Sequence, residues 1–332
     1  MVEVNRSAVR PAWQQRPVSY VPYIIIGIIL LALFPFVPAY AKSMLTQILI
    51  FGLFAMSLNL LVGYLGLFSL GHAAFFGVGG YTSAILITKF GITSFWLATP
   101  AGILAAAVVA AICGTIALRV TGLYFLFITM ALGQLLSAVA LKWEPMTKGA
   151  NGIIGIGYPN LALPFTMHET SFYYLVLLIV VICAFLMYRL VNSPFGHALQ
   201  GIREDERLMQ HLGYNTWLYK YITYIIAGLF AGVAGVLFGH FNNIFVPSFL
   251  DVLMSTTVAL MVIIGSSSMI FGPVTGAAVI LFLQYYASVF TPANWPLVLG
   301  AVFVIAIIFL RRGISVYLVN LWKRRVGKEG RI

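Results

Sequence analysis

The densest group of charged side chains in this sequence lies between residues 193 and 220. Three of the eight acids and two arginines are consecutive there: Arg203, Glu204, Asp205, Glu206 and Arg207. A strip of mixed charge can form ion pairs with a partner protein, and the alternative is a solvated helix in a surface loop. The concentration of charge in five positions favours a docking site.

The sequence around this strip predicts one short amphipathic helix over residues 198–213. Its apolar stripe would consist of Ala198, Ile202, Leu208 and Leu212. Gly213 suits the end of that helix, because glycine adopts the left-handed backbone that ends many helices.

Residues 71–84 form a second unusual stretch. It combines a histidine with four glycines: Gly71, His72, Gly77, Gly79 and Gly80. Close packing of helices would explain any one of these glycines. Their density favours the other explanation, in which unwound backbone borders a pathway for a substrate.

Metal and catalytic chemistry are not indicated. The five histidines are scattered without H-x-x-x-H spacing, and Cys113 and Cys183 each lie inside an apolar run. No cluster of His, Asp and Glu stands outside the charged strip, which disfavours a membrane enzyme. We therefore expect no catalytic residue, no metal and no cofactor in this chain.

The composition identifies the elements that carry these residues. Of 332 residues, 61% are hydrophobic and only 8% are charged, whereas soluble domains carry about 25% charged residues. This excludes a soluble enzyme. A nucleic-acid-binding domain is excluded as well, because the basic residues behind the net charge of +11 lie at segment ends and in tails.

The apolar runs predict an all-α fold, a polytopic membrane helix bundle with about ten spans. The candidate spans are 20–40, 43–63, 67–88, 94–118, 120–141, 172–191, 221–241, 252–270, 273–290 and 295–311. No strand is expected. The segment 67–88 is the one that we expect to be broken or re-entrant, because of its glycines.

The distribution of lysine and arginine predicts that both termini are cytoplasmic. This orientation leaves only four basic residues outside: Lys42, Lys89, Lys142 and Lys148. The domains would be an uncleaved cytoplasmic tail (1–19), the transmembrane domain (20–312) and a basic cytoplasmic tail (313–332). Within the membrane domain, 193–220 would be a cytoplasmic loop and 142–171 an outer loop.

Few acids lie near the expected membrane, and Asp251 is placed at the edge of a span. Ion-coupled transporters commonly keep ionisable groups within the membrane, which disfavours a stand-alone secondary transporter or channel. The chain also lacks the G-x-x-x-x-G-K-[ST] motif, so it cannot hydrolyse ATP by the P-loop route. If the chain takes part in energised transport, we expect another chain to supply the energy.

Several ordered blocks of sequence resemble one family. They are SLNLLVGYLGLFSLGHAAFFGVGGYTSA (57–84), RVTGLYFLFITMALGQLL (119–136), KGANGI (148–153), 193–239 and PSFLDVLMSTTVALMVIIGSSSMIFGPVTGA (247–277). Over about residues 44–312 the chain resembles the permease subunits of ABC importers for branched-chain amino acids, specifically the longer of two paralogous permeases.

The resemblance implies a set of partners and a location. They would be a shorter paralogous permease, two cytoplasmic ATPases that use the ATP, and a periplasmic or lipid-anchored solute-binding protein, in the bilayer of a bacterial plasma (inner) membrane. No nucleic acid is expected. The block 198–213 is similar to the family's segment that couples to an ATPase. The implied coupling residues are Gly201, Arg203, Glu204, Asp205, Glu206, Arg207 and Gly213.

The cargo remains open at this level. Branched-chain or related hydrophobic amino acids are implied, and relatives of this architecture carry urea, amides or aromatic compounds. Because no membrane carboxylate is expected, the cargo would meet helix ends, backbone groups and hydroxyls. The candidate pathway residues are Gly71, His72, Gly77, Gly79, Gly80, Thr82, Ser83 and Thr129.

Three positions depart from the pattern of the family that the chain resembles. His197 stands where an arginine is usual, and both Lys148 and Ser266 stand where a glycine is usual.

Overall fold

The computed structural model describes residues 38–160, 168–290 and 300, and most of these residues are helical. The chain divides after Lys42 into two units, of which the first contributes only residues 38–42 to the described part. The second unit, Ser43–Ile332, contains all the other described residues.

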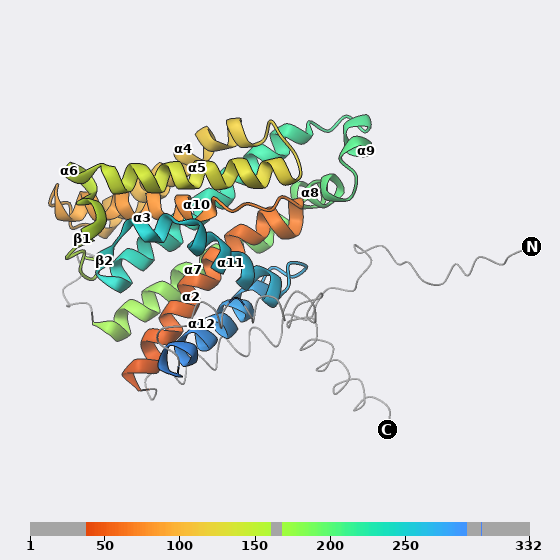
Figure 1. The fold of residues 1–332 in the computed structure, drawn as a ribbon. Helices are drawn as coiled ribbons and strands as arrows, with labels where there is room; N and C mark the ends of the chain where they lie inside the picture. Colours follow the sequence, from red (N-terminus) through yellow and green to blue (C-terminus); the bar gives the residue numbers. More distant parts are fainter. Residues whose placement is uncertain (1–37, 161–167, 291–299, 301–332) are drawn as a thin grey trace, which may run out of the picture. The chain divides into compact units, whose positions relative to one another are not determined.

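Eight long helices form the bundle (Figure 1). They are α2 (Ala39–Asn59), which continues as the π-helix η3 (Leu60–Leu65), α3 (His72–Thr88), α4 (Phe95–Ala117), α5 (Leu123–Lys142), α7 (Glu169–Val191), α10 (Thr216–Asn242), α11 (Val252–Gly265) and α12 (Gly272–Phe290). The connections hold α6 (Glu144–Thr147), η4 (Gly149–Asn151), α8 (Pro194–Glu204), α9 (Glu206–His211) and η5 (Pro247–Leu250).

The all-α polytopic fold is confirmed. Each of the eight predicted spans between 43 and 290 coincides with one long helix, whereas 20–40 and 295–311 fall largely or wholly outside the described residues. Among the described residues, five helices are long and apolar enough to cross a membrane, namely Tyr40–Leu65, α4, α5, α7 and α10. The predicted orientation and domain boundaries stay predictions.

Helices α3, α4 and α10 form the closely packed centre (Figure 1). A Cβ atom on Gly79 of α3 would lie 2.6 Å from the carbonyl oxygen of Gly232 in α10. One on Gly102 of α4 would lie 2.7 Å from the carbonyl oxygen of Gly79. Since lipid gives helices no hydrophobic reason to associate, such close approach supplies the van der Waals contact that holds a membrane bundle together.

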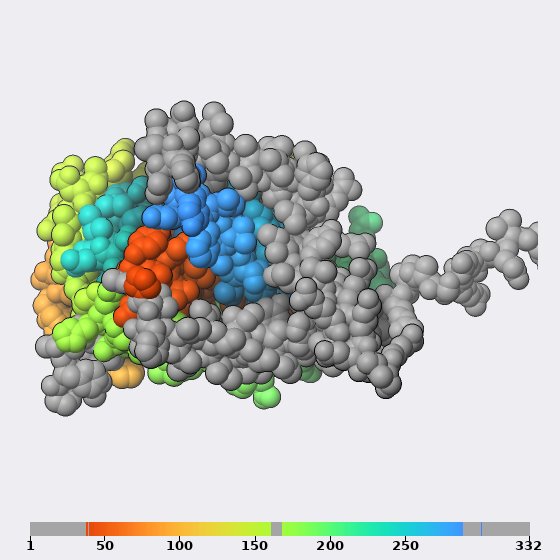
Figure 2. Space-filling view, turned by 90° about the horizontal axis from the view of Figure 1, so that it is seen from below, coloured from red at the N-terminus to blue at the C-terminus, as the bar shows by residue number. Residues whose placement is uncertain are grey.

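Two further helix pairs also approach each other closely at glycines. Figure 2 shows α2 and α12 lying side by side, and Gly52 of α2 faces the side chain of Val274 in α12. Helices α11 and α12 approach so closely that a Cβ on Gly265 or Gly276 would overlap the backbone of the partner helix.

A small β-hairpin interrupts the helical pattern. Strand β1 (Ile153–Ile154) pairs antiparallel with β2 (Ile244–Phe245), with Ile153 opposite Phe245. The expectation of no strand is wrong here, because two residues a side leave no periodicity for a sequence pattern to show. The hairpin and α6 lie at one end of the bundle, and α8 and α9 lie at the other (Figure 1).

The outer faces of α4 and α7 are apolar. Between their first and last turns, every exposed side chain on these helices is nonpolar, as in Leu104, Val108 and Ile112 of α4 and Leu178 and Phe185 of α7. Such faces suit contact with lipid chains.

Candidate functional site

The charged strip lies on two helices, not one. Helix α8 begins with Pro194 at its first turn and the Ser193 side chain accepting from Gly196 N at 3.4 Å. It stops before Asp205, whose backbone is extended (φ −153°, ψ 101°) and whose Oδ1 accepts from Leu208 N at 3.1 Å. The prediction of one helix over 198–213 is therefore wrong, because the Asp205 side chain caps a second helix, α9.

The predicted apolar stripe also ends at this break. Ala198 and Ile202 on α8 are buried, whereas Leu208 and Leu212 are 55% and 64% exposed. Gly213 has the expected left-handed backbone at φ +88°, and the next amide, Tyr214 N, donates to Met209 O at 3.1 Å. The helix end at Gly213 is thus confirmed, with the geometry of a Schellman motif.

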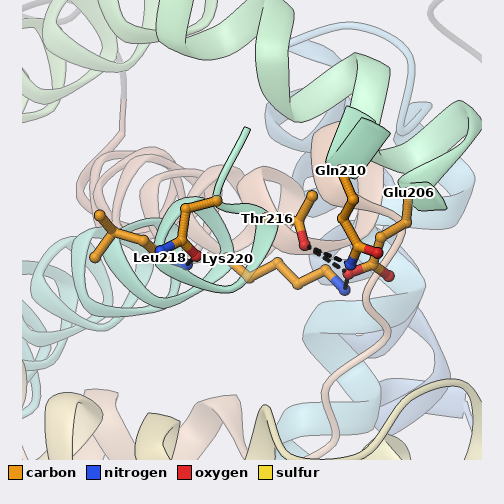
Figure 3. A network of polar contacts seen from close by, with 6 residues as sticks. Glu206, Gln210, Thr216, Leu218 and Lys220 are labelled. Atoms are coloured by element: carbon orange, nitrogen blue, oxygen red, sulfur yellow. Dashed lines mark hydrogen bonds and ion pairs between the residues drawn. The ribbon is translucent and has the colours of Figure 1, made fainter. Parts of the chain in front are cut away.

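Besides Asp205, which caps α9, two of the five charged side chains form contacts within the subunit. The Arg203 guanidinium donates to the carbonyl oxygen of Gly63 in η3, and its stem packs against Gly66. Glu206 forms an ion pair with Lys220 and accepts from the Thr216 hydroxyl at 3.1 Å, so that it ties α9 to the first turns of α10 (Figure 3). Glu206 is half-buried, and the other four charged residues of the strip are exposed.

The network at the start of α10 is the most buried polar cluster of the loop. Lys220 is 7% and Thr216 is 4% exposed, and Gln210 Nε2 donates to Thr216 Oγ1 at 3.1 Å (Figure 3). Asn215 caps α10 by accepting from Leu218 N at 3.1 Å. Sequence analysis missed Lys220 as a structural partner, although a lone lysine inside the apolar run WLYKYITYII is a signal for a buried ion pair.

A surface groove of about 460 Å³ lies between α8 and α9. Its lining residues are Asn192, Pro194, His197, Ala198, Met209, Leu212 and Tyr214. Gly201 lets α9 fold back over α8, since a Cβ there would lie 2.8 Å from the sulfur of Met209.

The chain leaves the helical path between η3 and α3. Gly66 has φ +75°, residues 67–71 are not helical, and α3 begins only at His72. Leu70 N donates to the hydroxyl of Thr129 in α5 at 3.3 Å, and Ala73 N donates to the hydroxyl of Ser255 in α11 at 3.0 Å. The expected break in 67–88 is therefore found only at the start of that segment. Unwound backbone at Gly77, Gly79 and Gly80 is a wrong expectation, because α3 is continuous through all three. The amides of Leu70 and Ala73 beside the non-helical residues donate to side chains of two other helices.

His72 lies at this break and is completely buried. Its Nε2 atom shares a hydrogen bond with Ser57 Oγ at 2.9 Å, and its ring stacks on Phe54. Gly71 lies against the backbone carbonyl of Thr129, where no side chain would fit.

The three glycines of α3 each face a different neighbour. Gly77 contacts the side chain of Leu250, Gly79 the backbone of Gly232, and Gly80 the ring of Phe245. Each contact is what close packing requires, so the packing explanation accounts for all three.

The predicted hydroxyl groups are mostly inside the subunit. Ser83 and Thr129 are 2% and 1% exposed, Thr82 is half-buried, and Thr129 Oγ1 donates to Leu126 O at 2.9 Å. Their role in a pathway stays a prediction, and cargo would reach them only after helices moved apart.

Asp251 lies at the start of α11, as expected for the edge of a span. Helix α11 has only 14 residues. The Ser137 hydroxyl of α5 donates to Asp251 Oδ1 at 2.6 Å, and Ser137 stands five residues before α5 ends at Lys142. Among the described residues, no group of three or more His, Cys, Asp or Glu could hold a metal ion.

Comparison with known proteins gives a consistent result. Residues 40–307 match the family model described as branched-chain amino acid transport system / permease component. High-affinity branched-chain amino acid transport system permease protein LivM of Escherichia coli (strain K12) is 29% identical over 292 residues, which cover 81% of this chain and 68% of LivM. LivM of Salmonella typhimurium is 28% identical over the same length.

The chain is also similar to a second permease protein of Escherichia coli. High-affinity branched-chain amino acid transport system permease protein LivH of Escherichia coli (strain K12) is 26% identical over 262 residues, which cover 72% of this chain and 83% of LivH. No solved structure matches the chain significantly.

Proposed function

Because the chain belongs to the family of permease components of branched-chain amino acid transport systems, we propose that it forms half of the translocation pathway of an ABC importer. The other half is a shorter paralogous permease, as the similarity to both LivM and LivH suggests. Two cytoplasmic ATPases supply the energy, and a periplasmic or lipid-anchored solute-binding protein delivers the cargo. The complex resides in the bacterial plasma (inner) membrane.

The observation that carries the coupling role is the double attachment of the loop between α7 and α10. Helix α8 contacts η3 through Arg203 and Gly63, and α9 contacts α10 through Glu206 and Lys220. A displacement of the loop therefore reaches two helices at once. One of them leads through Gly66 directly into the break before α3. This is the kind of connection that alternating access requires.

The surface that docks the ATPase is the exposed side of α9 and the groove beside it. Leu208 and Leu212 are exposed there, with Tyr214 in the groove wall and the unpaired Arg207 nearby. A patch of apolar side chains rimmed by charge is typical of a protein interface. Glu206 and Arg203 contribute by holding the patch in place.

The docking role is tested by the double variant Leu208→Asp/Leu212→Asp in the complete complex. We expect the ATPases to be lost from the purified membrane complex, because two carboxylates replace the apolar contact. Phe90→Asp is the matched control, since Phe90 is 61% exposed near the other end of the bundle. Retention of the ATPases by the double variant, with full stimulated ATP hydrolysis, would disprove the docking surface.

The attachment to η3 is tested separately by Arg203→Met. This variant keeps the apolar stem and loses the donor to Gly63, so we expect bound ATPases that hydrolyse ATP with little leucine transport. Arg189→Met, an exposed arginine in the last turn of α7 outside the docking surface, is the control and should transport normally. Equal transport by both variants would contradict a transmitting role for Arg203.

The cargo is identified by uptake into proteoliposomes that contain the complete importer. We expect uptake of leucine, isoleucine and valine that depends on ATP and on the binding protein. Uptake of urea or of an aromatic compound in place of these three would overturn the cargo assignment and leave the permease role intact.

A further inference from the structure

Helix α5 differs from α4 and α7 on its outer face. Most of the exposed side chains of α5 are apolar, as on its neighbours, but Gln134 is exposed as well. Gln134 stands eight residues before the end of α5 at Lys142, about 12 Å along the helix axis at the usual rise per residue. A carboxamide therefore lies exposed in the middle of a membrane-spanning helix.

Gln134 is connected to the carboxylate of Asp251 through Ser137. Residues three apart on a helix are neighbours on its surface, so Gln134 lies beside Ser137. Ser137 in turn donates to Asp251 Oδ1 at 2.6 Å. The helix spacing and this hydrogen bond place Gln134, Ser137 and Asp251 along the same edge between α5 and α11, and we call these three residues the polar strip.

This strip does not suit contact with lipid. Transfer of an amide into an apolar surrounding without a hydrogen-bond partner costs roughly 1–3 kcal/mol by mutational measures, and a carboxylate costs more. Ionisable groups within membrane proteins accordingly face the interior of a bundle or a water-filled space. Asp251 is only partly buried and Gln134 is exposed, so the space beside them lies outside this subunit.

The strip also differs from the pathway residues that the sequence suggested. His72, Ser83 and Thr129 are buried in contacts within the subunit, and Gly77, Gly79 and Gly80 are occupied by neighbours. Gln134 and Asp251 are polar, at least partly accessible, and connected through Ser137, which lies three residues from Gln134 and donates to Asp251. They require no separation of helices before a small molecule can reach them.

We propose that Gln134 and Asp251 line the translocation pathway and bind the charged ends of the amino-acid cargo. Asp251 accepts from the cargo's ammonium group through the oxygen that Ser137 does not occupy. The Gln134 carboxamide offers an acceptor to the ammonium and donors to the carboxylate. The inference rests on the proposed function, since it needs a zwitterionic cargo and a second permease on the far side of the pathway.

The test compares leucine uptake per assembled importer in proteoliposomes. Asp251→Asn keeps the size of the side chain and the acceptor for Ser137 but removes the charge. We expect uptake to fall about tenfold or more, in line with loss of a hydrogen bond to a charged group. Glu169→Gln is the matched control, because Glu169 on α7 also accepts from a serine, Ser43 Oγ at 2.9 Å. It should transport normally, and Asp251→Glu should recover part of the lost uptake.

Gln134→Leu tests the carboxamide with Gln47→Leu as its control, since Gln47 is a half-buried glutamine on α2. We expect a several-fold fall in uptake for Gln134→Leu alone, with binding of the ATPases unchanged. Normal uptake by both Asp251→Asn and Gln134→Leu would overturn the inference. So would a fall in the amount of assembled importer with unchanged uptake per importer, because the residues would then only hold subunits together. If the unaltered importer carries no leucine, the proposed function fails first, and this inference fails with it.

Discussion

The centre of the bundle and the loop between α7 and α10 are held together by opposite means. In the centre, glycines bring the backbones of α3, α4 and α10 into contact, as Gly79 does with Gly232. In the loop, a few polar contacts hold α8 and α9 to the neighbouring helices, and the principal one is the ion pair between Glu206 and Lys220. Backbone contact leaves no room for substitution, whereas a polar clamp can be exchanged for another pair. The centre is therefore suited to stay rigid while the loop conveys motion to it.

The largest effect is expected where the backbones are closest. Gly235 of α10 lies against the carbonyl of Phe76 in α3, and a methyl group there would overlap that backbone. We expect Gly235→Ala to lower the free energy of unfolding by about 3 kcal/mol, the upper range for overpacking. The measurement is the thermal midpoint and the yield of the purified membrane protein.

Gly239→Ala provides the control on the same helix. A Cβ at Gly239 would meet its nearest neighbour, the Phe245 ring, at an ordinary 3.4 Å. The comparison fails if both alanine variants have the same thermal midpoint.

An intermediate effect is expected for the clamp of the loop. Glu206→Gln leaves the charge of the buried Lys220 without its partner. Because the Glu206 side chain is 34% exposed, we expect a loss of about 2 kcal/mol, less than for a fully buried pair. Adding Lys220→Met to Glu206→Gln should restore most of the lost stability, because neither side chain of the former ion pair then carries a charge.

A double-mutant cycle on thermal stability measures this coupling. Glu204→Gln, two residues earlier and exposed, should change stability by less than about 0.5 kcal/mol. Additive effects of the two substitutions at 206 and 220 would show that the clamp does not stabilise the loop.

The smallest effect, and one of opposite sign, is expected at Ser266. This residue follows α11 with φ +111° and ψ 119°, a backbone region that favours glycine. We expect Ser266→Gly to raise the free energy of unfolding by about 1 kcal/mol. Ser268→Gly removes the same Ser266–Ser268 hydrogen bond without relieving strain, so it should not stabilise the protein.

Sequence reasoning succeeded where the signal is local. Long apolar runs located eight helices, and Gly213 marked a helix end. The glycines of 67–88 predicted a break, but the chain is non-helical only before His72, and Gly77, Gly79 and Gly80 lie within α3. The left-handed backbone at Lys148 (φ 61°) and at Ser266 also explains why glycine is usual at both positions in the family that the chain resembles.

Sequence reasoning failed where the partner is distant along the chain. Nothing near Arg203 indicates that its guanidinium reaches Gly63, 140 residues away. The start of a span next to Asp251 was predicted correctly. The hydrogen bond that Asp251 accepts from Ser137 of α5 was not predicted, because the two residues lie far apart in the sequence. The break at Asp205 did have a local signal, because aspartate is common at the start of a helix and Asp205 caps the amide of Leu208. The signal was missed because Asp205 was interpreted only as one of five consecutive charged residues.

The contacts of α10 with α3 and α4 also constrain the order of assembly during synthesis. About 100 residues separate the end of α4 at Ala117 from the start of α10 at Thr216. Helices α3 and α4 therefore leave the ribosome well before α10, and the side of Gly79 that contacts Gly232 has no α10 against it until then. A nascent chain that ends before residue 216 thus holds α3 and α4 but lacks α10, the third helix of the packed centre.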